Sequence, residues 1–252
     1  MNVKLSVRLT TVMLFLLSFS AQHICAQKRA DNHLTPLEKK EGYTLLWDGY
    51  TTKGWRAAYG TKFPDKGWEI KAGVLSVLAS NGAESTNGGD IVTEQEYGAF
   101  ILKFDFKLTE GANSGVKYFV TEKEASSGSA IGLEYQILDD KRHPDAKLGK
   151  DGNRTLSSLY DLIPSSKTKD VIMPIGNWNS GIIKVFPNNK VEHWLNGKCV
   201  VSYTRGDQSY QNLVKESKYK IWKDFGMAAK GHILLQDHGN AVSFKNIKIK
   251  TL

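Results

Sequence analysis

Several segments of this sequence place polar side chains at alternate positions between apolar ones. Glu134 and Gln136 alternate with leucine, tyrosine and isoleucine, and Lys117 stands between a valine and a tyrosine. Gln236 and His238 share one side of a third segment. Because alternate residues of an extended strand share one face, carboxylate, amine, imidazole and amide groups are expected together on a sheet. That mixture is typical of a sugar-binding concavity.

The carboxylates do not fit an ordinary glycosidase, which needs two of them about 5 to 9.5 Å apart. In the segment that carries Glu134, Asp139 would fall on the opposite face. Asp140 would lie on the order of 20 Å from Glu134 if the strand stays extended. The Glu-x-Asp-x-x-Glu spacing of laminarinase-like jelly rolls is absent. These observations count against direct hydrolysis through an oxocarbenium ion.

A divalent cation is an alternative to an amine as the electrophile of such a site. Its donors would be Glu134, His238 and His193. No established ligand spacing supports this set, and the alternation of His193 with apolar residues also fits a hydrogen-bonded core histidine. We therefore expect no required cofactor and assign no metal ligand, with a divalent cation as the alternative.

Strands must position these side chains, and from about residue 42 onward the apolar period is two. The clearest case is residues 100–108, where five large apolar side chains share one face. Asn196-Gly197 predicts a tight hairpin, and a slip in the alternation predicts a bulge near Asn246. Nine further strands are predicted at residues 68–70, 74–78, 116–120, 133–138, 182–186, 191–195, 199–203, 232–236 and 242–249.

These strands predict an all-β fold, a jelly-roll-like sandwich of two antiparallel sheets. With 252 residues, 40% of them apolar, the chain is long enough to bury one large core. A helix is expected only at residues 35–40, with Thr35 as its cap and Pro36 in the first helical position. Residues 141–153 and 205–227 lack alternation, and loops of this length are more often functional than idle.

Residues 1–26 have the features of a secretory signal peptide: basic residues, an apolar run and a plausible cleavage site. The apolar run is too short to span a membrane. We expect export to the periplasm, leaving an N-terminal segment of residues 27–41 before the domain of residues 42–252. A lipoprotein anchor on Cys25 is the disfavoured alternative, because the residues before it lack the usual small aliphatic types.

The net charge of +8 does not indicate a nucleic-acid partner. The lysines alternate with apolar residues, as solvent-facing strand positions do, and no basic run of five occurs. Export would also leave Cys199 as the last cysteine, so no internal disulfide is expected.

Ten short segments, in order along the chain, resemble the 3-keto-disaccharide hydrolase domain family, which is frequent in exported proteins of Bacteroides-type bacteria. They include Leu-Leu-Trp-Asp-Gly at 45–49, Asn-Ser-Gly-Val-Lys-Tyr at 113–118, Glu-Tyr-Gln-Ile-Leu-Asp at 134–139 and Leu-Gln-Asp-His-Gly at 235–239. The resemblance covers residues 42–252. It implies a concanavalin-like jelly roll that acts on, or at least binds, sugars whose 3-hydroxyl has been oxidised to a ketone.

A 3-ketone acidifies the hydrogen on C2, so the C1 substituent can leave by elimination and water can add afterwards. On this hypothesis Glu134 or His238 is the base and Lys117 stabilises the enolate. The remaining residues expected in the site are Gln136 and Gln236 at sugar hydroxyls, Tyr160 at the leaving oxygen, Asn113 and Ser114 at the pocket mouth, and Arg154 as a spare cation. An oxidoreductase would have to supply the oxidised sugar.

The alternative is a non-catalytic, lectin-like carbohydrate-binding module. It would use the same concavity, but its affinity would depend on aromatic stacking. Trp178, which lies between two asparagines in a predicted turn, is the candidate platform for that stacking.

Overall fold

The computed structural model describes residues 31–122 and 130–252. The predicted signal peptide and Cys25 lie outside these ranges. Within them, no helix has the length and apolar character needed to cross a membrane.

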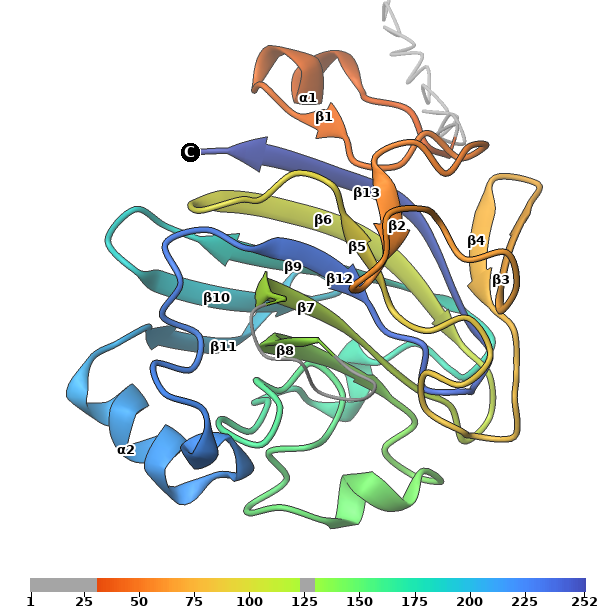
Figure 1. Ribbon diagram of the computed structural model, residues 1–252. Helices are drawn as coiled ribbons and strands as arrows, with labels where there is room; N and C mark the ends of the chain where they lie inside the picture. The colour runs from red at the N-terminus through yellow and green to blue at the C-terminus, as the bar shows by residue number, and fades with distance from the viewer. Residues whose placement is uncertain (1–30, 123–129) are drawn as a thin grey trace, which may run out of the picture.

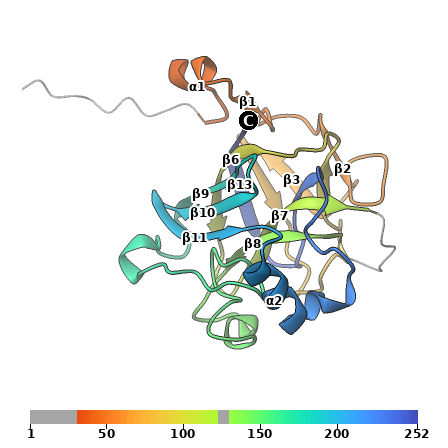
Figure 2. The ribbon, with the colours of Figure 1, turned by 90° about the vertical axis from the view of Figure 1, so that its left-hand side faces the viewer.

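Two antiparallel sheets pack face to face, which confirms the predicted concanavalin-like jelly-roll sandwich (Figures 1 and 2). The larger sheet has the order β11-β10-β9-β6-β13-β4-β3, with β1 paired to β13, and the smaller has the order β2-β5-β12-β7-β8. The strands are β1 Thr44–Leu45, β2 Trp55–Ala57, β3 Trp68–Lys71, β4 Val74–Val77, β5 Ile91–Thr93, β6 Phe100–Leu108, β7 Asn113–Thr121, β8 Ile131–Leu138, β9 Trp178–Val185, β10 Lys190–Leu195, β11 Lys198–Thr204, β12 His232–Leu235 and β13 Val242–Thr251.

All ten predicted strands are present, and the three that were missed, β1, β2 and β5, have only two or three residues. The predicted bulge is confirmed, because the pairing of β13 with β6 shifts register between Lys245 and Lys248 and Asn246 has a φ of 55°. Helix α1 (Pro36–Lys40) is confirmed with its Thr35 cap. Helix α2 (Gln208–Glu216) lies in a stretch for which no helix was predicted.

The core forms where the inner faces of the two sheets meet. Along β6 the side chains are alternately buried and half-buried, as the period of two requires. Phe104 of β6 meets Tyr135 of β8 edge to face, with ring centroids 5.3 Å apart. His193 is fully buried in the same layer, where its Nε2 lies 2.9 Å from Tyr118 Oη and its Nδ1 3.2 Å from the Ser157 carbonyl. It is therefore a core histidine.

The segment before β1 is held to the outer face of the larger sheet. The Asn32 N–H donates to Asn246 Oδ1 at 2.6 Å, and the Asn246 N–H donates to Asn32 Oδ1 at 2.8 Å, so the bulge itself is the attachment point. In α1 the Glu38 carboxylate accepts from Lys248 Nζ at 2.9 Å. Burial alone would raise the pKa of Glu38, but hydrogen bonds from the Thr35 N–H and Lys248 outweigh it and lower the pKa to about 2.

Glu38→Gln is expected to reduce the free energy of unfolding at pH 7 by about 2 kcal/mol, the order expected for a partly buried carboxylate with cationic partners. Because the folded-state pKa lies below the ordinary glutamate value of 4.5, the contribution is complete above pH 4.5 and is lost as the pH falls toward 2. Denaturant unfolding at several pH values measures this. The exposed carboxylate of Glu69 on β3 provides the control, Glu69→Gln, which should change little. A difference between wild type and Glu38→Gln that persists undiminished at pH 2 would contradict the assignment.

Candidate functional site

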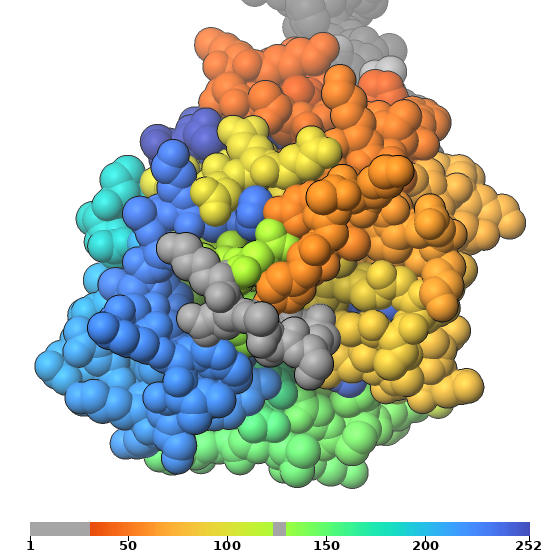
Figure 3. Space-filling view, in the orientation of Figure 1, coloured from red at the N-terminus to blue at the C-terminus, as the bar shows by residue number. Residues whose placement is uncertain are grey.

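A pocket of about 390 Å³ lies on the outer face of the smaller sheet. Segments far apart in the sequence border this face, with orange and gold residues on one side, blue residues on the opposite side and green residues below (Figure 3). The lining residues are Glu84, Asn113, Lys117, Ala130, Ile131, Gly132, Glu134, Gln136, Tyr160, Lys218, Tyr219, Trp222, Gln236 and His238.

Seven of the ten residues expected in the site line this one pocket. They come from three adjacent strands and the segments after them: Asn113 and Lys117 from β7, Glu134 and Gln136 from β8, Gln236 and His238 just after β12, and Tyr160 from the segment beyond β8. Register explains the meeting of the central pair, since Lys117 and Glu134 are direct partners in the antiparallel pairing of β7 with β8.

Glu134 is the central carboxylate of the pocket, and only 6% of it is exposed. No residue in the described ranges donates a hydrogen bond to its carboxylate. Room for it comes from Gly115 on β7, where a Cβ atom would overlap with Glu134 Oε1. Burial raises the pKa of Glu134, while the positive charges of Lys117 and Lys218 oppose that rise. A carboxylate whose pKa is raised in this way is suited to act as a general base near neutral pH.

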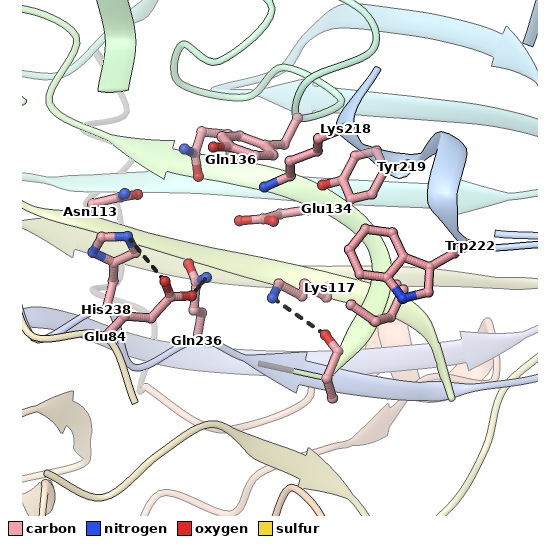
Figure 4. A pocket seen from close by; sticks show the side chains of 14 residues that line it. Glu84, Asn113, Lys117, Glu134, Gln136, Lys218, Tyr219, Trp222, Gln236 and His238 are labelled. Carbon is pink, nitrogen blue, oxygen red and sulfur yellow. Dashed lines mark hydrogen bonds and ion pairs between the residues drawn. The ribbon is translucent and has the colours of Figure 1, made fainter. Parts of the chain in front are cut away.

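Two lysines lie on either side of this carboxylate (Figure 4). Lys117 Nζ donates to the Ala130 carbonyl at 3.4 Å. Lys218 belongs to the short helix η3 (Lys218–Ile221), and its Nζ lies 4.3 Å from the centre of the Tyr160 ring. Lys218 remains exposed to solvent, yet partial desolvation by the pocket walls lowers the pKa of its ammonium. The pocket therefore presents a carboxylate between two cations.

One end of the pocket is rich in unsatisfied hydrogen-bonding atoms. Asn113 Oδ1, Gln236 Oε1 and His238 Nδ1 are buried without a hydrogen-bond partner in the described structure. An unpaired buried polar group costs about 1–3 kcal/mol, so three of them at one place indicate a ligand that supplies the missing partners. Beside them Glu84 Oε1 accepts from Gln236 Nε2 at 3.2 Å. A group of hydrogen-bond donors and acceptors such as this suits the hydroxyl groups of a sugar.

A buried carboxylate and a buried hydroxyl hold the walls of this polar end in place. Asp237, which is fully buried, accepts from the N–H groups of Gly88 at 3.2 Å and Gly89 at 3.0 Å. These bonds fix the segment that carries Glu84 against the end of β12. Ser114 has a similar structural role, since its Oγ donates to the Gln236 carbonyl at 2.8 Å. It was expected at the pocket mouth, but it does not line the pocket.

Tyr160 reaches the pocket through its ring, while its hydroxyl is engaged elsewhere. The Tyr160 Oη donates to Asp145 Oδ2 at 2.8 Å. Arg154 contacts Asp145 at 3.0 Å and Asp161 at 2.6 Å, and its guanidinium stands 5.3 Å from the Tyr160 ring centre. Arg154 is thus not available as a cation in the pocket, because two carboxylates neutralise its charge. It helps to position Tyr160 through Asp145, which both residues contact.

Trp178 lies outside the pocket, contrary to expectation. It begins β9 in the larger sheet, where its indole is flanked by Lys107 Nζ at 5.1 Å and Lys245 Nζ at 4.4 Å. Lys107 and Trp178 are direct partners in the pairing of β6 with β9. The asparagines beside Trp178 suggested an exposed turn, whereas the residue belongs to a strand.

Four polar or aromatic lining residues were missed by sequence reasoning, Glu84, Lys218, Tyr219 and Trp222, as were the smaller or apolar Ala130, Ile131 and Gly132. Three of them come from residues 205–227, the stretch that was expected to be functional because it lacked alternation. Tyr219 stacks on Phe225 with ring centroids 3.9 Å apart, and Arg205 Nη1 donates to the Gly226 and Ala228 carbonyls. These contacts fold the stretch over the open side of the pocket.

The three donors considered for a divalent cation do not converge. His193 faces the core, whereas Glu134 and His238 line the pocket on the opposite face of the smaller sheet. Among the residues described by the structure, no group of three or more His, Cys, Asp or Glu side chains is arranged to hold a metal. The proposed ligand set is therefore wrong.

The 3-keto-alpha-glucoside-1,2-lyase-like domain family matches residues 42–250. The chain belongs to this family. A 3-keto-disaccharide hydrolase of Bacteroides thetaiotaomicron is 34% identical to this chain in an alignment of 233 residues that covers 84% of this chain and 79% of the relative. The resemblance inferred from the ten sequence segments is confirmed.

Two solved structures are also similar to this chain. A candidate glycosyl hydrolase from Parabacteroides distasonis has a TM-score of 0.76 and 33% identity, covering 88% of this chain and 100% of its own. A second candidate glycosyl hydrolase from the same species has a TM-score of 0.58 and 26% identity, covering 79% of this chain and 99% of its own.

Gly115→Ala is expected to displace the Glu134 carboxylate, because the added methyl group would occupy its place. We expect a loss of about 1–2 kcal/mol in the free energy of unfolding, as for other overpacked sites. The control is the Glu134→Ala background, in which the collision is absent and Gly115→Ala should cost less than about 0.5 kcal/mol. Denaturant unfolding of the four proteins measures both values, and an equal cost in the two backgrounds would contradict this role of Gly115.

Proposed function

We propose that this protein cleaves the glycosidic bond of 3-keto-glycosides by eliminating the C1 substituent. The observation that carries the proposal is the buried carboxylate of Glu134 between the ammonium groups of Lys117 and Lys218. A base beside two cations is what proton abstraction next to a ketone requires. The name of the Bacteroides relative, a 3-keto-disaccharide hydrolase, supports the same substrate class.

In the proposed first step Glu134 takes the proton from C2. The electron pair of the C2–H bond moves toward the ketone at C3, and the enolate oxygen accepts a hydrogen bond from Lys117. We assign the base to Glu134, not to His238, because Glu134 alone of the two lies between the cations (Figure 4). His238 lies at the polar end, with its Nε2 3.9 Å from Glu84 Oε2, where it could form a hydrogen bond with a sugar hydroxyl.

In the second step the C1–O bond breaks as the enolate collapses and a C1–C2 double bond forms. The leaving oxygen needs a proton, and the Tyr160 hydroxyl already donates its own to Asp145. Lys218 is the better donor because its lowered pKa brings it nearer to neutrality. Addition of water across the new double bond would turn elimination into net hydrolysis.

A lectin-like module remains the rival function. Its predicted stacking platform, Trp178, lies outside the pocket, whereas Trp222 lines it. A cavity of about 390 Å³ is at the small end of the range for small-molecule sites and suits a mono- or disaccharide. The proposal further includes export to the periplasm and an oxidoreductase that supplies the 3-keto sugar. Export is supported by the sequence of residues 1–26, and the oxidoreductase by the chemistry of the substrate.

Glu134→Gln is expected to lower kcat for a 3-keto-glucoside by a factor of about 10³, within the range for loss of a general base, while the dissociation constant changes less than about threefold. The unoxidised parent glucoside should not be cleaved by either protein. Glu84→Gln, the other pocket carboxylate, serves as the control and should chiefly raise KM. Cleavage of the parent but not of the 3-keto-glucoside would overturn the proposal. Full turnover by the Glu134→Gln variant would show that another residue is the base.

Lys218→Met is expected to shift the acidic limb of the kcat/KM profile to higher pH. The base acts only when Glu134 is deprotonated, and the positive charge of Lys218 holds its pKa down. Removing that charge raises the pKa, so activity is lost at a less acidic pH. Lys220→Met, on the same short helix and exposed, is the matched control and should leave the limb in place. A limb that moves to lower pH, or does not move, would contradict the electrostatic coupling.

A further inference from the structure

The two ends of the pocket differ in chemistry. Asn113, Gln236 and His238 supply the unsatisfied polar atoms of one end. Trp222 marks the other end, and the carboxylate of Glu134 lies between the two ends (Figure 4). A ligand that fills the whole pocket therefore meets hydrogen-bonding groups on one side of the base and an apolar wall on the other.

Trp222 is held firmly enough to act as a wall. It follows η3 directly, and its backbone N–H donates to the Tyr219 carbonyl at 3.0 Å. Its ring lies 6.1 Å from that of Tyr219, which is itself stacked on Phe225. The indole nevertheless remains half-exposed, so one part is anchored and another is available to a ligand. An anchored, partly exposed indole is suited to pack against a ring.

We propose that Trp222 forms the subsite for the leaving group and that this subsite favours apolar or aromatic substituents. The inference rests on the proposed function, which puts C2 at Glu134. C2 is bonded to C1 on one side and to C3 on the other, so a sugar that turns C3 and its neighbouring hydroxyls to the polar end turns its C1 substituent to Trp222. The polar end thus selects the oxidised sugar, and Trp222 selects what is attached to it.

The test compares methyl and 4-nitrophenyl 3-keto-glucosides of one anomeric configuration. Their dissociation constants are measured on Glu134→Gln protein, which binds without turnover, with residue 222 as Trp, Phe or Ala. The 4-nitrophenyl compound should bind about tenfold more tightly than the methyl compound, the order expected for one aromatic contact. The ratio should fall below about twofold in Trp222→Ala and be largely kept in Trp222→Phe. Trp178→Ala, on the other sheet, is the matched control and should keep the full ratio.

The outcomes separate this inference from the function on which it rests. A ratio that survives Trp222→Ala, or binding of neither compound, overturns the leaving-group subsite. If wild-type protein turns over both compounds and shows no preference, the proposed reaction stands and the subsite is wrong. If the ratio depends on Trp222 but wild-type protein releases no product, the subsite stands as a binding site and the proposed reaction is wrong.

Discussion

The site depends on keeping one carboxylate out of water on the outer face of a β-sheet. Withdrawing a carboxylate from solvent is unfavourable unless other groups compensate, and here two lysines supply the opposite charge. The sheet makes the arrangement possible. Tyr135, the neighbour of Glu134 along β8, points into the core and anchors the strand, so Glu134 must point outward. Gly115 then leaves the space that the carboxylate fills. Packing on one face of β8 thus determines the chemistry on the other.

Much of the fold and the strand-borne half of the site could be predicted from the sequence, because both follow from a period of two. Glu134, Lys117 and Gln136 were found in this way. Strands of two or three residues, such as β5, are too short to show alternation. Glu84 and Trp222 escaped prediction because they lie on irregular segments whose positions depend on contacts distant in sequence, such as those of Asp237. Arg154 was misjudged because its neutralising carboxylates reach it only through the folding of its own loop.

The sandwich does not by itself specify a reaction, since such sheets carry many unrelated sites. In this protein the two ends of the pocket differ in chemistry, and that difference would determine how a substrate is oriented in it. The polar end is bonded to the backbone and buried, as Asp237 and Ser114 show. The aromatic end rests on η3, which is held by ring packing and by the hydrogen bonds of Arg205. A rigid end suits recognition of a constant sugar, and an end built on side-chain packing suits substituents that vary.

The place of β12 in the smaller sheet has a consequence for how the protein is made. This strand lies between β5 and β7, yet it is the second to last strand along the chain. Until it inserts, β2–β5 and β7–β8 are two separate hairpin-sized pieces with unpaired edges, which are prone to aggregation. Glu84 and Glu134 can therefore share one cavity only after residues 232–238 have been synthesised. A polypeptide without β12 would lack the pocket wall that Gln236 and His238 form and would expose two unpaired strand edges.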